Sequence, residues 1–246
     1  MSDKPLLVLV HGWGVNASVW NAVLADLAQD FEILAPELFG HAADALYING
    51  NGIEDVTDAL AQQIERPAIC VGWSLGALLV LRLAISSADK VGSVLLVSAT
   101  PVFMQRSDWA KGMPQEQLEL FMTDFRDHPQ RSLKRFHALQ ARGDAHARRV
   151  LTALRAGGVD DVADRSEGLQ KGLEHLRDTD LRRQLAGIEQ SVHLLHGVND
   201  AVVPGDAGRY LADTLGGDLQ LWEQVGHAPF LSQPQRFTDW VRQAAA

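Results

Sequence analysis

The sequence predicts an α/β fold: a mostly parallel, doubly wound sheet, with a helical cap inserted after the fourth strand. The main observation is a series of short runs, rich in Val, Ile and Leu, that are apolar at nearly every position. Such runs are typical of strands buried on both faces of a parallel sheet. Segments with helical spacing of apolar residues separate most of them, and this alternation indicates βαβ units.

The core elements follow one another along the chain. Strands are expected at 6–10, 31–35, 68–72, 93–99, 191–197 and 219–223. Helices are expected at 18–30, 53–65, 75–87, 206–215 and 234–246. Pro234 suits the first turn of the last helix, because an N–H at that position would have no acceptor within the helix.

The alternation is interrupted between the fourth and fifth strands. From residue 101 to about residue 187 no strand-like run occurs, and apolar residues recur at helical spacing instead. One such series is Leu118, Phe121, Met122 and Phe125, with the i, i+3, i+4, i+7 pattern. We therefore expect a helical cap over 101–187 and an α/β core formed by 1–100 and 188–246.

Composition excludes several classes of protein. Lys and Arg number 22 and Asp and Glu 31, so the net charge is −9 and general nucleic-acid binding is disfavoured. Cys70 is the only cysteine, which excludes an intrachain disulfide and any C-x-x-C metal pattern. No apolar run approaches the ~18 residues of a membrane helix, and we see no secretion signal. The expectation is a cytoplasmic protein that does not bind membranes.

The sharpest local motif is Gly72-Trp73-Ser74-Leu75-Gly76, a G-x-S-x-G pattern between a predicted strand and a predicted helix. That context is the one a nucleophile elbow requires: a tight turn exposes the serine hydroxyl, and small neighbours are needed around it. The alternative is a glycine turn that happens to contain a serine. We favour Ser74 as a nucleophile.

A serine hydroxyl needs a base, and the base needs an orienting acid. In this type of fold the acid precedes the histidine in the chain. His227, between the last strand and the last helix, is the candidate base, although a simple loop histidine is the alternative. Asp200 follows the strand at 191–197 and is the candidate acid. Asp206 is the second choice, since it also fits the start of the next helix.

An oxyanion needs backbone N–H donors. The expected donors are Leu75, directly after the nucleophile, and Trp13, in the glycine-rich turn after the first strand. His11 and Cys70 are interpreted as packing residues. His193 and His196 fall on opposite faces of a strand and do not form a metal pair, so we expect no metal and no cofactor.

Four motifs together resemble the α/β-hydrolase superfamily, and within it the pimeloyl-[acyl-carrier protein] methyl ester esterases of biotin synthesis. The motifs are HGWG (11–14), GWSLGA (72–77), HGVNDAVVP (196–204) and GHAPF (226–230). The resemblance implies a carboxylesterase and, including the stretch at 136–140, substrate contacts at Trp13, Ser74, Leu75, Phe136, His137, Ala138, Leu139, Gln140 and His227. This chain departs from the superfamily at 36–41 and at Ala77, where glycine is frequent.

The charge distribution suggests a partner. Residues 126–155 carry eight cations and two anions, a net +6, which leaves −15 for the other 216 residues. Such a patch would attract an acidic partner, although a solvated helix face is the alternative. The resemblance implies that Arg131, Arg135 and Arg148 contact an acyl-carrier protein. A further family arginine corresponds to Thr152, close to Arg149 and Arg155.

We therefore expect a monomeric serine carboxylesterase that hydrolyses the methyl ester of pimeloyl-acyl-carrier protein. A carboxylesterase or thioesterase of broad specificity is the nearest alternative, and a carbon–carbon bond hydrolase a more distant one. A dehalogenase is disfavoured because the elbow carries serine rather than aspartate. A non-catalytic ligand receptor on the same scaffold is the alternative outside enzymes, and the order Ser74, Asp200, His227 argues against it.

Overall fold

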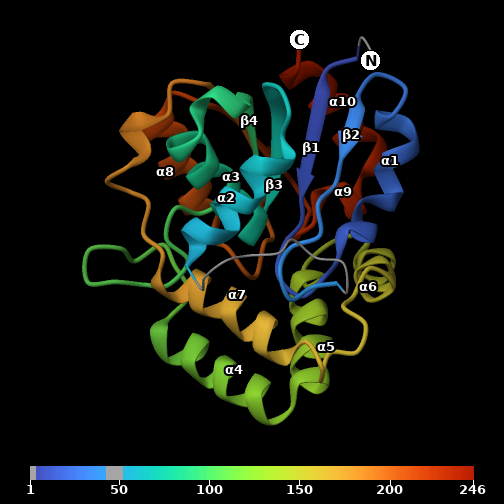
Figure 1. Ribbon diagram of the computed structural model, residues 1–246. Helices are drawn as coiled ribbons and strands as arrows, with labels where there is room; N and C mark the ends of the chain where they lie inside the picture. Colours follow the sequence, from blue (N-terminus) through green and yellow to red (C-terminus); the bar gives the residue numbers. More distant parts are fainter. Residues whose placement is uncertain (1–3, 43–51) are drawn as a thin grey trace.

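The computed structural model describes residues 4–42 and 52–246, which form a six-stranded, fully parallel sheet with the order β2-β1-β3-β4-β5-β6 (Figure 1). The strands are β1 (Leu6–Val10), β2 (Glu32–Leu34), β3 (Ala68–Trp73), β4 (Val91–Val97), β5 (Ser191–Gly197) and β6 (Asp218–Trp222). Each lies within about two residues of its expected range. The order reverses at β1 and β3, and open α/β sheets place their sites at the carboxyl ends of strands near such a reversal.

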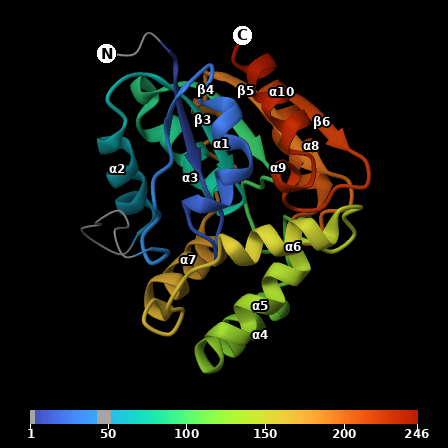
Figure 2. The same cartoon turned by 90° about the vertical axis from the view of Figure 1, so that its right-hand side faces the viewer.

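Helices cover both faces of the sheet (Figures 1 and 2). On one face lie α2 (Ile53–Gln63), α3 (Leu75–Ser86) and α8 (Gly205–Leu215). On the other lie α1 (Asn21–Leu27), α9 (Pro229–Ser232) and α10 (Pro234–Ala244). Short 3₁₀ turns occupy Ala17–Trp20, Ala88–Lys90 and Leu185–Gly187. The short helix α9 was not predicted, because four residues between two prolines are too few to show a helical period.

Two hydrophobic cores lie on the two faces of the sheet. In β1, Leu6, Val8 and Val10 point into the core under α3. The alternate residues Leu7 and Leu9 point into the core under α1 and α10. This explains why the strand is apolar throughout: at ~1.5–3 kcal/mol for each fully buried aliphatic side chain, both faces of it stabilise the fold. Cys70 is buried in the first core, as expected for a packing residue.

The segment between β4 and β5, residues 101–187, is called the cap below. It contains α4 (Gln115–Asp127), α5 (Pro129–Gln140), α6 (Ala147–Ala156) and α7 (Ser166–Asp178), which lie across the carboxyl ends of the strands (Figure 1). Its two ends meet in a bridge between Val102 and Asp180. Leu118, Met122 and Phe125 form the buried face of α4, as their spacing predicted.

In the part of the chain that the structure describes, no helix has both the length and the apolar content needed to cross a membrane.

Candidate active site

Ser74 lies in a strained turn between β3 and α3. Its φ of 57° and ψ of −115° are rare for any residue with a side chain. The two glycines of the motif permit this turn. A Cβ on Gly72 would lie 2.6 Å from Cα of Ala77, and one on Gly76 would lie 2.2 Å from the carbonyl oxygen of Val10. The sequence therefore folds into the elbow geometry that exposes a serine hydroxyl above the sheet.

His227 and Asp200 form a buried pair. Nδ1 of His227 lies 2.8 Å from Oδ2 of Asp200, and neither side chain has exposed surface. Because an ionised carboxylate can only accept, Nδ1 is assigned the proton, and Nε2 is left as the basic nitrogen. Nε2 is buried and has no hydrogen-bond partner among residues 4–42 and 52–246. A base with this tautomer can take a proton from a hydroxyl.

The carboxylate of Asp200 is held in its ionised form. Burial alone would raise the pKa of this carboxyl, but the charge of His227 and the hydrogen bonds of His196 and His227 hold the pKa well below its ordinary value. Oδ1 also accepts the backbone N–H groups of Val202 at 2.8 Å and Val203 at 2.9 Å. Asp200 can therefore orient the histidine and stabilise its protonated form.

Asp206, the second candidate acid, is elsewhere. Its side chain is 71% exposed in the first turn of α8, and its closest charged partner is Arg209, at 3.9 Å. The structure thus brings Asp200, and not Asp206, to His227.

The backbone of His227 is fixed from three elements. Its carbonyl oxygen accepts hydrogen bonds from Nε1 of Trp73 at 2.7 Å and from Oγ of Ser98 at 2.9 Å. Its N–H donates to the carbonyl oxygen of Gln140, at the end of α5, at 3.2 Å. Trp73 directly precedes Ser74, and its ring packs against the imidazole, with centroids 5.5 Å apart. The elbow and the base are therefore coupled through one tryptophan.

Trp13 and Leu75, the predicted oxyanion donors, both lie next to the elbow. A Cβ on Gly12 would lie only 3.3 Å from Cβ of Ser74, so the turn that carries Trp13 rests against the nucleophile. Leu75 is the first residue of α3, and the N–H of a first helical residue has no acceptor within its helix. Two backbone donors beside a serine are suited to an oxyanion.

The side chain of Trp13 joins the core to the cap. Nε1 donates to the carbonyl oxygen of Leu169 in α7 at 2.7 Å. The indole makes edge-to-face contacts with Phe121, Phe125 and Phe136, at centroid distances of 5.6, 5.3 and 5.1 Å. The side chain of Trp13 therefore packs against the cap helices, while its backbone lies in the turn next to Ser74.

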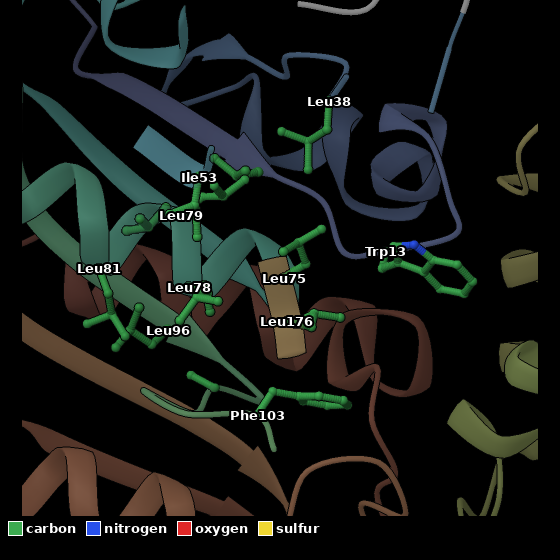
Figure 3. Close-up of a cluster of buried hydrophobic side chains, with 14 of the residues drawn as sticks. Trp13, Leu38, Ile53, Leu75, Leu78, Leu79, Leu81, Leu96, Phe103 and Leu176 are labelled. Carbon is green, nitrogen blue, oxygen red and sulfur yellow. The ribbon is translucent and has the colours of Figure 1, made fainter. Parts of the chain in front are cut away.

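The cap also forms an apolar cavity of about 550 Å³ that is partly open to solvent. Phe136 connects Trp13 to the cavity, because its ring contacts the indole and also lines the cavity. Ser74 and His227 do not line it. Figure 3 shows Leu75, Leu176 and Phe103 one below another within the first core, and the last two also line the cavity. Leu75, directly after the nucleophile, therefore packs in the same core as two residues that line the cavity.

The stretch 136–140 of α5 faces in several directions, because helical residues rotate by about 100° each. Phe136 and Gln140 are buried, and Leu139 lines the cavity. His137 is buried with Nε2 2.9 Å from the carbonyl oxygen of Gly14, and burial lowers the pKa of this histidine. Ala138 is exposed on the outer face. Of these five implied substrate contacts, the structure brings Phe136 and Gln140 to Trp13 and His227.

Two of the implied carrier-protein contacts have an internal partner. Arg131 and Arg135 lie 2.5 Å and 3.2 Å from the carboxylate of Asp124, which also accepts Oγ of Ser132 at 2.6 Å. Asp124 lies two residues before the basic window and lowers its effective charge. Both guanidinium groups remain more than half exposed, and Arg148 is exposed on α6.

Sequence reasoning missed His196 and Asp144. Nε2 of His196 lies 3.3 Å from Oδ2 of Asp200, and the side chain of Asp144 contacts the loop that carries His227. The i, i+4 spacing of His196 and Asp200 was a signal for the first contact. Asp144 had none, because it lies 82 residues from its partner Gly226.

Among the described residues, no three His, Cys, Asp or Glu side chains are grouped to hold a metal ion.

The chain belongs to the alpha/beta hydrolase family, whose model matches residues 7–240. Among curated proteins it is similar to the pimeloyl-[acyl-carrier protein] methyl ester esterase of Aromatoleum aromaticum, with 38% identity over 95% of each chain. The protein of that name from Nitrosomonas europaea is 37% identical over 96% of this chain and 93% of its own.

Solved structures show the same fold. An esterase from Exiguobacterium antarcticum superposes with a TM-score of 0.86 and 21% identity, over 100% of this chain and 94% of that chain. A bromoperoxidase from Bacillus anthracis has a TM-score of 0.86 and 19% identity, over 99% and 92%. The expected fold class and family are confirmed.

Proposed function

We propose that this protein is a serine carboxylesterase that hydrolyses the methyl ester of pimeloyl-acyl-carrier protein. The products are methanol and pimeloyl-acyl-carrier protein with a free carboxylate, which is used for biotin synthesis. The buried pair of His227 and Asp200, together with Ser74 in its strained turn, carries the proposal for the chemistry. The names of full-length relatives at 37–38% identity support the substrate.

The reaction proceeds through an acyl-enzyme. Oγ of Ser74 attacks the ester carbonyl carbon while Nε2 of His227 takes its proton, and the N–H groups of Trp13 and Leu75 stabilise the oxyanion. The imidazolium then protonates the departing methoxide, which leaves as methanol.

Water attacks the acyl-enzyme in the second half of the reaction. His227 takes a proton from the water, and the second tetrahedral intermediate collapses as the imidazolium returns a proton to Oγ of Ser74. Asp200 stays ionised and keeps the imidazole in the productive tautomer. These steps use side chains, backbone N–H groups and water.

Substrate recognition divides between the interior and the surface of the cap. The apolar cavity beside Phe136 suits an aliphatic acyl chain. The amide of Gln140 is buried and has no partner among the described residues, so it can hydrogen-bond the ester end of the substrate. On the outer surface, Arg131, Arg135 and Arg148 would contact the acidic carrier protein. A monomer in the cytoplasm is part of the same proposal.

Two measurements test the proposal. A fluorophosphonate should label Ser74, and labelling should be lost in Ser74→Ala. The value of kcat/KM for methyl pimeloyl-acyl-carrier protein should exceed that for p-nitrophenyl acetate. A higher value for the small ester would instead identify a carboxylesterase of broad specificity, and an unlabelled Ser74 would refute the serine mechanism.

A further inference from the structure

The cap reaches the candidate base through the connection between α5 and α6, residues 141–146. Within it Asp144 is buried, with 7% of its surface exposed. Oδ2 of Asp144 accepts the backbone N–H of Gly226, the residue before His227, at 2.8 Å. Oδ1 accepts Oγ of Ser232 at 2.9 Å and the backbone N–H of His146 at 2.7 Å. One carboxylate of the cap is therefore bonded on both sides of His227 along the chain.

Backbone contacts reinforce this attachment. The N–H of Ala145 donates to the carbonyl oxygen of Gln224 at 2.8 Å. Gln224 has a φ of 59°, which residues with side chains rarely adopt, so this loop needs outside contacts to keep its shape. A Cβ on Gly226 would lie 3.1 Å from the carbonyl oxygen of Gln140. Glycine thus allows the cap and the histidine loop to approach this closely.

The same connection also touches the loop that carries the acid. Nδ2 of Asn199, the neighbour of Asp200, donates to the carbonyl oxygen of Gly143 at 2.7 Å. The backbone N–H of Asn199 donates to the carbonyl oxygen of Val225 at 2.9 Å, which joins the acid loop to the histidine loop. Residues 141–146 therefore fix both loops in relation to each other.

We infer that Asp144 is a positioning residue for the reaction proposed above. Its carboxylate fixes the backbone at Gly226 and, through it, the placement of the His227 ring between Asp200 and Ser74. Hydrogen bonds to an ionised acceptor are short and strong, so the carboxylate holds this backbone more firmly than a neutral group would. Misplacement of a reacting group by 1 Å can cost ~100-fold in rate, so firm placement matters. The inference rests on the proposed function.

The first test is hydrolysis of p-nitrophenyl acetate, with enzyme concentrations set by fluorophosphonate titration. Asp144→Ala should lower kcat by ~10- to 100-fold and leave KM within about twofold, because the lost group positions the base and binds no substrate. Asp144→Asn and Ser232→Ala should lie between it and the parent, because an acceptor for the N–H of Gly226 remains. Asp127→Ala, at an exposed carboxylate of the cap, is the matched control and should retain kcat.

The second test needs no turnover. The Nδ1 proton of His227 should give a downfield NMR resonance in the parent, which broadens or disappears in Asp144→Ala while the protein still melts cooperatively. A kcat within about twofold of the parent, with an unchanged resonance, would overturn the inference. If Asp144→Ala does not fold, parent-like kcat and resonance in both Asp144→Asn and Ser232→Ala would overturn it. Failure of the serine mechanism itself would appear separately, as activity retained by Ser74→Ala.

Discussion

At the residue scale, the site depends on a single carboxylate with every acceptor position in use. Asp200 receives two backbone N–H groups on Oδ1 and faces His227 and His196 on Oδ2. Nε2 of His196 also lies 3.0 Å from the carbonyl oxygen of Val203, so it carries a proton. Burial would lower the pKa of His196, but the hydrogen bond and the charge of Asp200, together with the carbonyl group of Val203, raise it. The carboxylate of Asp200 is therefore fully hydrogen-bonded without exposure to solvent.

From this arrangement we expect Asp200 to be essential for activity and Asp206 to be dispensable. Asp200→Asn should lower kcat by up to ~10⁴-fold, because an amide can stabilise the wrong tautomer of His227. Asp206→Asn is the matched control. This residue lies six positions further on, in the first turn of α8, and because its side chain is exposed the substitution should leave kcat unchanged. Steady-state kinetics with a p-nitrophenyl ester decide between them. Retained activity in Asp200→Asn, with loss in Asp206→Asn, would contradict the assignment of the acid.

Replacing the amide of Gln140 should make the protein more stable and weaken its binding of the ester substrate. Its amide is 1% exposed and unpartnered within the described part of the chain, and each such group costs ~1–3 kcal/mol when buried. Gln140→Met keeps the shape without the polar atoms, so it should raise Tm by a few degrees. It should also raise KM for the ester substrate, which loses a hydrogen-bonding partner. Thermal melts and kinetics on the same preparation test both effects; a lower Tm with unchanged KM would argue for a structural role of the amide.

At the element scale, α5 serves three surfaces at once. Its buried face presents Phe136 to Trp13, and its last carbonyl group binds the N–H of His227. On a second side of the helix, Nε2 of His137 contacts the carbonyl oxygen of Gly14. Its outer face carries Arg131 and Arg135, which Asp124 of α4 holds in place. One helix thus joins the proposed carrier-protein surface to the loop of His227, the proposed base.

Because Asp124 partly neutralises these arginines, its removal should strengthen carrier-protein encounter. Asp124→Asn should raise kcat/KM for the carrier-linked ester at low salt. Neutralising Arg131, Arg135 and Arg148 together should lower it, and high salt should reduce both effects, since exposed charges are screened beyond ~8–10 Å.

The controls are a substrate and a variant. Hydrolysis of p-nitrophenyl acetate, a small neutral ester, should change little in either variant. Arg209→Ala removes an exposed arginine of the core and should leave kcat/KM for the carrier-linked ester unchanged. An undiminished kcat/KM for that ester in the triple variant would refute the carrier-protein contact.

At the scale of the whole molecule, local patterns were sufficient for the core. Apolar runs predicted all six strands of the described sheet, since strands buried on both faces need no partner residue to be recognised. The elbow was predictable because Gly72 and Gly76 are required within five residues of sequence. The pairing of Asp200 with His227 followed from chain order, and the geometry agrees with it.

Contacts between distant segments were not predictable. The bond from Asp144 to Gly226 depends on how the cap folds over the core. The bonds from Asp124 to Arg131 and Arg135 depend on how α4 packs against α5. Nothing in the spacing of these residues distinguishes them from solvated surface charges. The direction of each side chain at 136–140 likewise depends on the rotation of α5 against the core.

Stability should fall in acid partly through a buried histidine next to the site. His41 is 2% exposed, and its Nδ1 lies 2.9 Å from the carbonyl oxygen of Phe39. Burial, and secondarily the charge of His11, lower the pKa of His41 to about 3. The unfolded chain binds this proton near pH 6.5, whereas the folded chain binds it only near the lower value. The contribution of neutral His41 to the free energy of unfolding is therefore complete above pH 6.5 and is lost as the pH falls toward 3.

His41→Asn isolates this effect, because the asparagine amide can still donate to Phe39 but does not titrate. Urea unfolding of parent and variant at pH 7.5, 6, 5 and 4 gives the measurement. The parent should lose up to a few kcal/mol more than the variant between pH 7.5 and 4. His137 and Asp200, whose pKa values are also lowered, remain in both proteins and cancel in the difference. Parallel curves for the two proteins would show that His41 takes up its proton without unfolding the surrounding loop.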